Sequence, residues 1–236
     1  MDYFTDFLTR TGDRMLTKWE HYFDVYTREL GEFRDRPVRF LEIGIFKGGS
    51  IPMWQGFFAP GSHLVFADID PACRDFALPG THVEIGDQAD PDFLEHLGKT
   101  HGPFDLILDD GGHMMHQQTA SLFGLWRHLA DRGRYLVEDT HTSYWPGFGG
   151  GLNAPNSFIE LSKMLVDAMH SWYTDDDEAF PFNPMAVELD GVRFYDSIVV
   201  LEKRVKTEAP ISVTAMNGQV ARSRKMLEMR GRASIF

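Results

Sequence analysis

Two short apolar runs in this chain end abruptly in carboxylates, each followed closely by a histidine. Phe104–His113 reads FDLILDDGGH, and Arg134–Trp145 reads RYLVEDTHTSYW. If both runs are strands of one parallel sheet, their carboxyl ends meet at one crevice, where three or four carboxylates share a pocket with one or two histidines. Such like charges repel strongly at low dielectric, and a hard divalent cation is the simplest compensation. The alternative is two unrelated turns, since Asp and Gly are common where strands end.

A glycine-rich turn earlier in the chain indicates a nucleotide-like cofactor. Leu41–Ser50 reads LEIGIFKGGS, which is a strand with an acidic residue, a glycine-rich turn and the start of a helix. This order is typical of dinucleotide or adenosine binding, but the spacing differs from the GxGxxG of a pyrophosphate site. The carboxylate of Glu42 suits a cationic ligand, such as the amino group of S-adenosylmethionine, better than a pyrophosphate. The pattern therefore favours a Rossmann-like methyltransferase over a nicotinamide enzyme.

Two further strand ends add polar groups to the same predicted pocket. His63–Ala67 ends at Asp68, in the place of a ribose-binding carboxylate, and Asp70 is a rival for that role. The next predicted strand is followed by Asp87 and Gln88, which we expect to hydrogen-bond the edge of the adenine ring. The residues that we expect at the cofactor are Glu42, Gly44, Lys47, Gly49, Ser50, Asp68, Asp87, Gln88 and Asp109.

The elements that position these residues alternate between strands and helices, which predicts βαβ units and a parallel sheet. Strands are expected at Val38–Ile43, His63–Ala67, Thr81–Ile85, Phe104–Leu108 and Tyr135–Val137. Helices are expected at Phe4–Leu8, Trp19–Leu30, Ile51–Phe58, Pro91–Leu97, Leu122–Leu129 with closure near Gly133, and Ser157–Trp172. Because Asp190-Gly191 is a strong turn signal, we expect an antiparallel hairpin at the sheet edge, formed by Ala186–Leu189 and Val192–Leu201.

A segment rich in glycine, proline and aromatic residues interrupts the alternation. Ser143–Asn156 reads SYWPGFGGGLNAPN, which is too long and too glycine-rich for an ordinary connection and predicts a mobile lid over the active site. Tyr144 and Trp145 are expected to close over the substrate, and Tyr22 is expected to contact it from the N-terminal helix. The alternative is a disordered surface loop.

We expect three regions in the chain. These are an N-terminal helical cap (1–36), a methyltransferase domain (37–205) that contains the lid (141–157), and a C-terminal tail (206–236). In the cap, Lys18 is a candidate for a wall of the pocket, whereas Trp19 is better suited to core packing. The end of the tail mixes basic and apolar residues, so it either packs on a neighbouring subunit or frays.

Composition narrows the class of protein. The 236 residues fit one sizeable α/β domain, and 43% of them are hydrophobic, which is enough for a buried core. The net charge of −12 argues against a nucleic-acid partner, whose phosphates need a basic surface. The acidity fits an enzyme for a small neutral or cationic molecule, or it serves solubility alone.

Location and assembly follow from weaker signals. No apolar run is long enough for a membrane-spanning helix, and the N-terminus lacks the pattern of a signal peptide. Cys73 is the only cysteine, so no disulfide forms within the chain and we expect a cytoplasmic location. Aromatic residues near the N-terminus and the basic, apolar tail lead us to expect a homo-oligomer, either a dimer or a tetramer.

Taken in order, five segments of the chain resemble a known family: LEIGIFKGGS, VFADIDP, GDQAD, LILDDGGH and LVEDTHTSYWPGFGGG. The family is the class I S-adenosylmethionine-dependent, metal-dependent O-methyltransferases. The chain is most similar to members that methylate deoxysugar hydroxyls on macrolides and other glycosylated natural products, such as the mycinamicin and tylosin sugar methyltransferases. The resemblance covers the chain from Lys18 to Lys203.

The resemblance implies a fold and limits what can be transferred. The implied fold is an α/β, Rossmann-like class I methyltransferase fold, with a mostly parallel seven-stranded sheet and a C-terminal antiparallel hairpin. The implied partner is a small-molecule glycoside, with no nucleic acid and no membrane. The larger mycinamicin-type enzyme has a long N-terminal region without a counterpart in these 236 residues, so its substrate contacts and oligomeric state are not carried over.

The resemblance also implies roles for individual residues. Asp110, Glu138 and Asp139 stand at the spacing of the family's metal ligands, for which we expect Mg²⁺, while Mn²⁺ also suits an all-oxygen site. His113 stands in the place of the base proposed for the mycinamicin-type enzyme, and His141 is its rival. The metal would lower the pKa of a sugar hydroxyl and orient it beside the methyl group. The expected catalytic residues are therefore His113, Asp110 and His141.

Other activities are compatible with these motifs. A catechol or another vicinal diol would use the same metal geometry, so an O-methyltransferase for such acceptors is the first alternative. A non-haem iron hydroxylase with His113, His141 and Asp110 as its triad is a distant alternative, and some relatives carry the label cephalosporin hydroxylase. That reading leaves the glycine-rich turn and Asp68 unexplained. A non-catalytic protein on the same scaffold is the last alternative.

Overall fold

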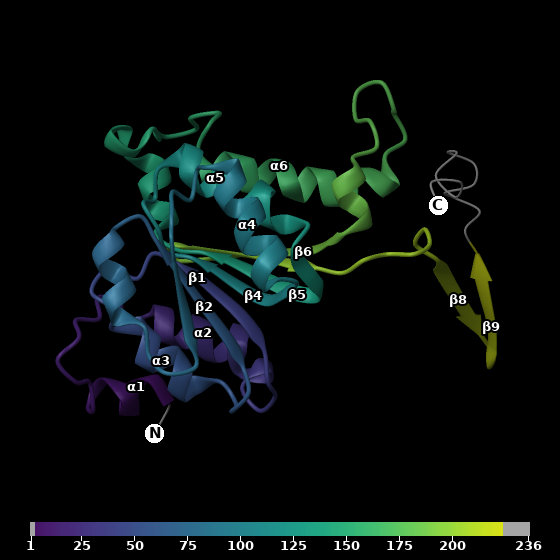
Figure 1. The fold of residues 1–236 in the computed structure, drawn as a ribbon. Coiled ribbons are helices and arrows are strands. Elements are labelled where there is room, and N and C mark those ends of the chain that lie inside the picture. Colours follow the sequence, from purple (N-terminus) through teal and green to yellow (C-terminus); the bar gives the residue numbers. More distant parts are fainter. Residues whose placement is uncertain (1–2, 224–236) are drawn as a thin grey trace.

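A computed structural model describes residues 3–223, in which seven strands form one sheet (Figure 1). The strands are β1 (Arg39–Ile43), β2 (His63–Asp68), β3 (Thr81–Ile85), β4 (Phe104–Asp109), β5 (Leu129–Val137), β6 (Leu189–Tyr195) and β7 (Ile198–Lys203). Their order in the sheet is β3-β2-β1-β4-β5-β7-β6, with β1 to β5 parallel and β7 antiparallel to both of its neighbours. The predicted α/β fold with a mostly parallel seven-stranded sheet and a C-terminal antiparallel hairpin is confirmed.

Helices cover both faces of the sheet (Figure 1). One face carries α1 (Tyr3–Leu8), α2 (Tyr22–Leu30) and α3 (Ser50–Phe57), and the other carries α4 (Pro91–His101), α5 (Met115–Trp126) and α6 (Phe158–His170). Because successive side chains of a strand point to opposite faces, Phe40 packs into the first layer and Leu41 into the second. Strands buried on both faces read as continuous apolar runs, which is the pattern of this sequence. No helix among residues 3–223 is long and apolar enough to cross a membrane.

Aromatic packing fixes the two helices of the N-terminal region to the sheet. The Phe4 ring stacks on Phe57 of α3, with ring centroids 5.0 Å apart, and lies 5.4 Å from the ring of Tyr26 in α2. Tyr26 in turn packs edge-on against Trp54, and all four side chains are buried. Such aromatic pairs each add about 0.5–1.5 kcal/mol beyond the area they bury. The segment between α1 and α2 is therefore held at both ends.

The C-terminal hairpin turns at a different place from the one predicted. The turn lies at Asp196-Ser197, where Ser197 has φ +63°, and not at Asp190-Gly191. Gly191 lies inside β6, next to a shift in the β6–β7 register. Ala186 and Val187, the first residues of the expected strand Ala186–Leu189, belong instead to a short 3-10 helix, Pro184–Val187. The buried run that begins at Ile198 sets the pairing with β5, so long-range packing overrides the local turn signal.

Two other boundaries differ from expectation. Helix α5 ends at Trp126 and does not continue to Gly133. Gly133 lies within β5, where the register with β4 shifts between the pairs Phe104–Leu129 and Leu106–Arg134. Helix α2 begins at Tyr22, so Trp19 is outside it. The Trp19 side chain is 56% exposed, and its predicted role in core packing is wrong.

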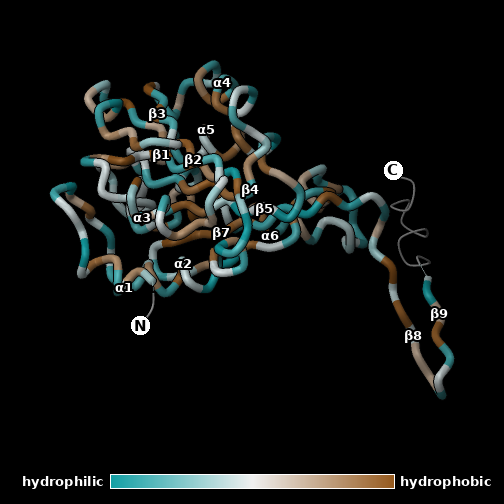
Figure 2. Tube along the Cα trace, turned by 60° about the horizontal axis from the view of Figure 1, so that its bottom comes forward, coloured by the Kyte–Doolittle hydropathy of each residue, from teal (hydrophilic) through white to brown (hydrophobic). Residues whose placement is uncertain are grey.

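Beyond the main sheet, β8 (Ser212–Met216) and β9 (Gln219–Ser223) form a separate two-stranded sheet, which we call the arm. The arm extends away from the main sheet, and much of β8 is apolar (Figures 1 and 2). All ten of its strand residues are exposed. An isolated two-stranded sheet is only marginally stable in water. The rest of the predicted tail, residues 224–236, lies outside the described residues.

A histidine cluster at the amino end of β2 is expected to make the stability of the fold depend on pH. The ring nitrogens His63 Nε2 and His101 Nδ1 lie 3.0 Å apart, and His101 Nε2 is 3.0 Å from a carboxylate oxygen of Glu84. Burial, followed by the cationic Arg39, lowers the pKa of His63 to about 4. The folded chain thus keeps His63 neutral, whereas the unfolded chain protonates it below about pH 6.5.

Stability is consequently expected to fall as the pH is lowered from about 6.5 to about 4. His63→Gln retains an amide at the position of Nε2 but has no titratable group. In thermal melts between pH 7 and pH 4.5, the wild type should lose more of its Tm than the variant. Equal losses for the two proteins would contradict this prediction.

Candidate active site

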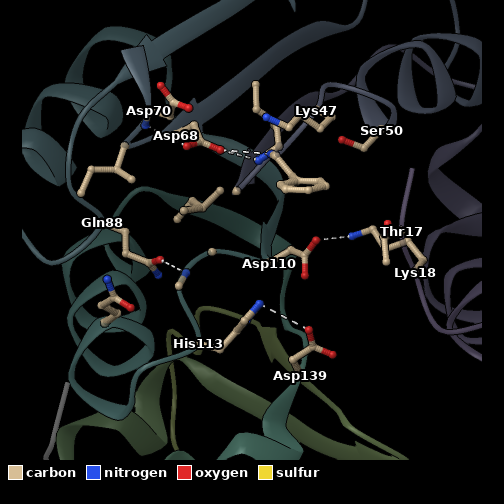
Figure 3. Close-up of a pocket in the computed structure, with 18 of the residues that line it drawn as sticks. Thr17, Lys18, Lys47, Ser50, Asp68, Asp70, Gln88, Asp110, His113 and Asp139 are labelled. Atoms are coloured by element: carbon tan, nitrogen blue, oxygen red, sulfur yellow. Dashed lines mark hydrogen bonds and ion pairs between the residues drawn. The ribbon is translucent and has the colours of Figure 1, made fainter. Parts of the chain in front are cut away.

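A cavity of about 620 Å³ opens at the carboxyl ends of β1, β2 and β4 (Figure 3). Open α/β sheets bind ligands at this edge. The predicted site residues that line it are Gly44, Lys47, Ser50, Asp68, Asp87, Gln88, Asp110, His113 and Asp139. The predicted convergence of strand-end side chains on one crevice is therefore seen in the structure, while the role of each residue stays a prediction.

The glycine-rich turn is shaped by contacts with the neighbouring strands. Gly44 has φ +86°, and a Cβ atom there would collide with the carbonyl oxygen of Asp110, so no other residue fits. Asp68 Oδ2 accepts hydrogen bonds from the backbone N–H groups of Ile45 (2.9 Å) and Phe46 (3.2 Å). Asp68 thus anchors the turn to the end of β2 as well as lining the cavity.

Asp109 and Gln88 hold the loop that carries Asp110. Asp109 is fully buried and accepts hydrogen bonds from Ser121 and from Gln88 Nε2 (3.0 Å). Gln88 Oε1 accepts from the backbone N–H of Gly112 (2.7 Å). Asp109 was expected at the cofactor, but it lies outside the cavity lining, because these bonds turn its carboxylate into the protein beside α5.

The buried carboxylates of Glu42 and Glu138 and the partly exposed carboxylate of Asp110 meet around one ammonium at the edge of the cavity. Lys18 Nζ lies 2.6 Å from Asp110 Oδ2, 2.9 Å from Glu138 Oε2 and 3.7 Å from Glu42 Oε1. We call these four side chains the acid cluster. The other oxygen of Glu138 accepts a hydrogen bond from the Tyr26 hydroxyl, and Glu42 Oε2 accepts one from Ser50 Oγ (2.6 Å). Neither Glu42 nor Glu138 lines the cavity.

Burial controls protonation in the acid cluster. It raises the pKa of Glu42 to about 7, that of Asp110 to about 6 and that of Glu138 to about 8, and the Lys18 ammonium opposes each rise. Burial by itself lowers the pKa of Lys18, but Asp110 and then Glu138 raise it well above its ordinary value. The cluster therefore binds protons near neutral pH, and a cation that enters it displaces them.

Asp139 and His113 face each other across the cavity edge, as Figure 3 shows. His113 Nε2 lies 3.4 Å from Asp139 Oδ2, and both residues have left-handed backbone conformations. The Tyr22 hydroxyl donates to Asp139 Oδ1 (2.6 Å). Tyr22 was expected to contact substrate, but its side chain is fully buried and fixes Asp139 instead. His113 Nδ1 is buried without a hydrogen-bond partner.

These residues fit a divalent cation. Asp110, His113 and Asp139 each offer a ligand atom within 4.8 Å of the others, and within the described part of the chain no other group of three His, Cys, Asp or Glu side chains does so. Two carboxylates with an imidazole suit ions such as Mn²⁺ and, through the oxygens, Mg²⁺. The set contains one histidine, so the two-histidine triad of a non-haem iron hydroxylase is not formed.

The predicted lid lies beside the cavity and does not line it. It begins with two short 3-10 helices, Thr140–Tyr144 and Pro146–Phe148, and the Tyr144 and Trp145 side chains are each 49% exposed. The Trp145 ring packs edge-on against His141, whose Nδ1 contacts Ser197 Oγ. His141 is thus tied to the lid and the hairpin turn, and His113 is the histidine that lines the cavity.

The sequence pointed only weakly to the polar groups that come from the N-terminal region. Lys18 was expected to wall the pocket rather than to sit among carboxylates, and Tyr26 was assigned only to an apolar helix face. The spacing of Lys18, Tyr22 and Tyr26, one helical turn between successive residues, places a polar group at regular intervals along an otherwise apolar stretch. That regularity is the signal that could have identified them.

Comparison with known proteins finds that the chain is similar to O-methyltransferases. No protein-family model matches it. It is 35% identical over 219 residues to demethylmacrocin O-methyltransferase of Streptomyces fradiae, an alignment that covers 86% of this chain and 55% of the relative. It is also 35% identical over 205 residues to L-olivosyl-oleandolide 3-O-methyltransferase of Streptomyces antibioticus, covering 78% and 52%. The chain is a homologue of sugar O-methyltransferases.

A solved structure of a sugar-pathway methyltransferase has the same fold as this chain. The methyltransferase MycE of the mycinamycin biosynthetic pathway, in complex with Mg and SAH, superposes with a TM-score of 0.75 and 27% sequence identity. The match covers 93% of this chain and 57% of MycE. This chain therefore has the class I methyltransferase fold, in agreement with its strand order. It spans about half the length of the curated relatives that it matches.

Proposed function

We propose that the chain is an S-adenosylmethionine-dependent O-methyltransferase that methylates a sugar hydroxyl on a glycosylated natural product, such as a macrolide or another antibiotic. The observation that carries the proposal is the cavity at the carboxyl edge of the sheet, which has the glycine-rich turn on one side and Asp110, His113 and Asp139 on the other. The homologous sugar O-methyltransferases support both the reaction and the class of acceptor.

In this proposal the cofactor occupies the part of the cavity between the glycine-rich turn and the end of β2. Asp68 and Asp70 both line that part, and either carboxylate suits the ribose hydroxyls. Asp87 lines the same cavity at the end of β3. The acid cluster adjoins the cavity through Lys18 and Asp110, and its negative charge favours a sulfonium and an amino group over a pyrophosphate.

Asp110 and Asp139, with Glu138 from the acid cluster, would hold a divalent cation such as Mg²⁺ or Mn²⁺ beside His113. When bound, that ion supplies Lewis acidity that lowers the pKa of a coordinated hydroxyl. His113 lines the cavity, and its Nε2 would accept the hydroxyl proton while the methyl group passes from the sulfonium to the sugar oxygen. Tyr22 keeps Asp139 in place through its hydroxyl. Tyr144 and Trp145 are half exposed and would have to close over the sugar when it binds.

Calorimetric titration with S-adenosylhomocysteine, before and after removal of divalent metal, tests the proposal without knowledge of the acceptor. We expect micromolar binding that survives chelation, because the glycine-rich turn and Asp68 are built without a metal. Glycosides are then screened for methylation with added Mg²⁺, with a catechol as the comparison acceptor. Absence of binding in both states would overturn the cofactor assignment, and a preference for the catechol would overturn the acceptor class.

The proposal extends to assembly and location. A homo-oligomer and a cytoplasmic location stay predictions from the sequence. The exposed arm supports the former, because Val213, Met216 and Val220 are each more than half exposed in a two-stranded sheet. Light scattering of the purified protein measures the assembly directly.

A further inference from the structure

The segment between α1 and α2, residues 9–21, crosses the cofactor cavity, and we call it the strap. It has no regular secondary structure, yet Met15, Leu16, Thr17 and Lys18 all line the cavity. A Cβ atom on Gly49 would collide with the Met15 carbonyl, so the strap lies directly on the glycine-rich turn. With the strap in this position, a ligand in the cavity is covered from the side of the N-terminal region.

Two basic residues of the strap, Arg14 and Lys18, anchor it around the cavity. Arg14 Nη1 donates to the carbonyl oxygen of Phe76 (2.6 Å), near the outer end of the cavity. Lys18 is the inner anchor, and its side chain is only 2% exposed. Lysine is almost never buried to this degree without a partner of opposite charge. The carboxylates of Asp110 and Glu138 are those partners, so the strap is fixed through the same groups that the proposed metal needs.

An ammonium and a metal ion cannot both lie between these two carboxylates. Lys18 Nζ is 2.6 Å from Asp110 Oδ2 and 2.9 Å from Glu138 Oε2. A Mg²⁺ ion needs oxygens at about 2.1 Å, so it would have to occupy nearly the same point. Three carboxylates also exceed the charge of one ammonium, and Glu42 Oε1 is buried without a hydrogen-bond donor. The acid cluster is thus built for more positive charge than Lys18 provides.

We propose that Lys18 and a divalent cation compete for Asp110 and Glu138, so that metal binding releases Lys18 and frees the strap from the cofactor cavity. The inference rests on the proposed function, because it takes Asp110 and Glu138 as metal ligands. Linkage makes the effect reciprocal: whatever holds the strap closed weakens metal binding, and metal binding loosens the strap. Lys18 is therefore a positioning residue that couples the metal site to the cover of the cofactor cavity.

The test compares the wild type with Lys18→Met, which keeps the length of the side chain and removes its charge. Mn²⁺ affinity is measured by calorimetry, and hydrogen exchange of residues 9–21 is followed with and without Mn²⁺. We expect Lys18→Met to bind Mn²⁺ at least about tenfold more tightly than the wild type. In the wild type, Mn²⁺ should increase exchange in the strap, whereas the strap of Lys18→Met should exchange fast in both conditions.

Lys47→Met is the matched control, because it removes the same charge from the same cavity without touching the acid cluster. Its Mn²⁺ affinity should stay within about twofold of the wild type, since a lysine in contact with solvent is screened. The proposal would be overturned if Lys18→Met bound Mn²⁺ no more tightly than the wild type. It would also be overturned if Mn²⁺ did not change hydrogen exchange in the wild-type strap. If neither protein binds Mn²⁺, the competition is also refuted, and S-adenosylhomocysteine binding by the same samples reports separately on the methyltransferase assignment.

Discussion

Replacing Asp110 with asparagine is expected to lower turnover by about 10²- to 10³-fold while leaving the affinity for S-adenosylhomocysteine nearly unchanged. Asparagine has the shape of aspartate, but it removes a charge that a metal ion and the Lys18 ammonium both need. The glycine-rich turn contacts Asp110 through the backbone carbonyl, which the substitution leaves in place, and Asp68 lies at the end of another strand. Turnover is measured at saturating methyl donor with a glycoside acceptor and Mg²⁺, and affinity by calorimetry.

Asp68→Asn serves as the comparison variant, because it makes the same chemical change at the other side of the cavity. It should show the opposite pattern, with weaker cofactor binding and a smaller loss of turnover at saturation. Asp68 anchors Ile45 and Phe46, so the glycine-rich turn loses part of its support. If Asp110→Asn keeps full activity with Mg²⁺ as the only metal, the assignment of Asp110 as a ligand is wrong.

Replacing His113 with asparagine is expected to lower kcat by about 10²- to 10⁴-fold, the usual contribution of a general base. Asparagine is the appropriate replacement because His113 has φ +56°, a left-handed conformation that asparagine adopts more readily than alanine. The variant therefore separates loss of the base from backbone strain.

His141→Asn is the control for this measurement. His141 contacts Ser197 and the Trp145 ring and does not line the cavity, so its loss should change kcat far less than the loss of His113. A normal kcat for His113→Asn together with a large loss for His141→Asn would reverse the assignment. Melting temperatures of both variants show whether either result comes from a damaged fold.

The parts of the fold that the sequence predicts well are those in which local pattern and burial agree. Phe40 and Leu41 each pack into a different helix layer, and such doubly buried strands give continuous apolar runs that are easy to recognise. The polar residues that follow these runs, such as Asp110 and Asp139, then reach one crevice because parallel strands end at one edge. Strand ends are therefore enough to predict which carboxylates meet.

The features that the sequence does not predict depend on partners far away in the chain. The hairpin turn at Ser197 is one example, because the pairing of β7 with β5 outweighs the local signal at Gly191. Lys18 is another, because nothing near it in the sequence indicates that its ammonium reaches Asp110 and Glu138. Asp109 is a third, since only the packing of α5 decides that it bonds to Ser121. In all three cases, tertiary contacts determine the observed structure.

The acid cluster also imposes an order on folding. Lys18 and Glu138 are separated by 120 residues, and Tyr22 and Asp139 by 117. During synthesis the strap therefore leaves the ribosome long before the carboxylates that neutralise it exist. Burying a lysine without a partner carries a desolvation penalty of several kcal/mol, so the strap remains solvated until β4 and β5 have joined the sheet. The strap is thus made well before its partners and docks after them, and a nascent chain keeps its cofactor cavity uncovered until its parallel strands are complete.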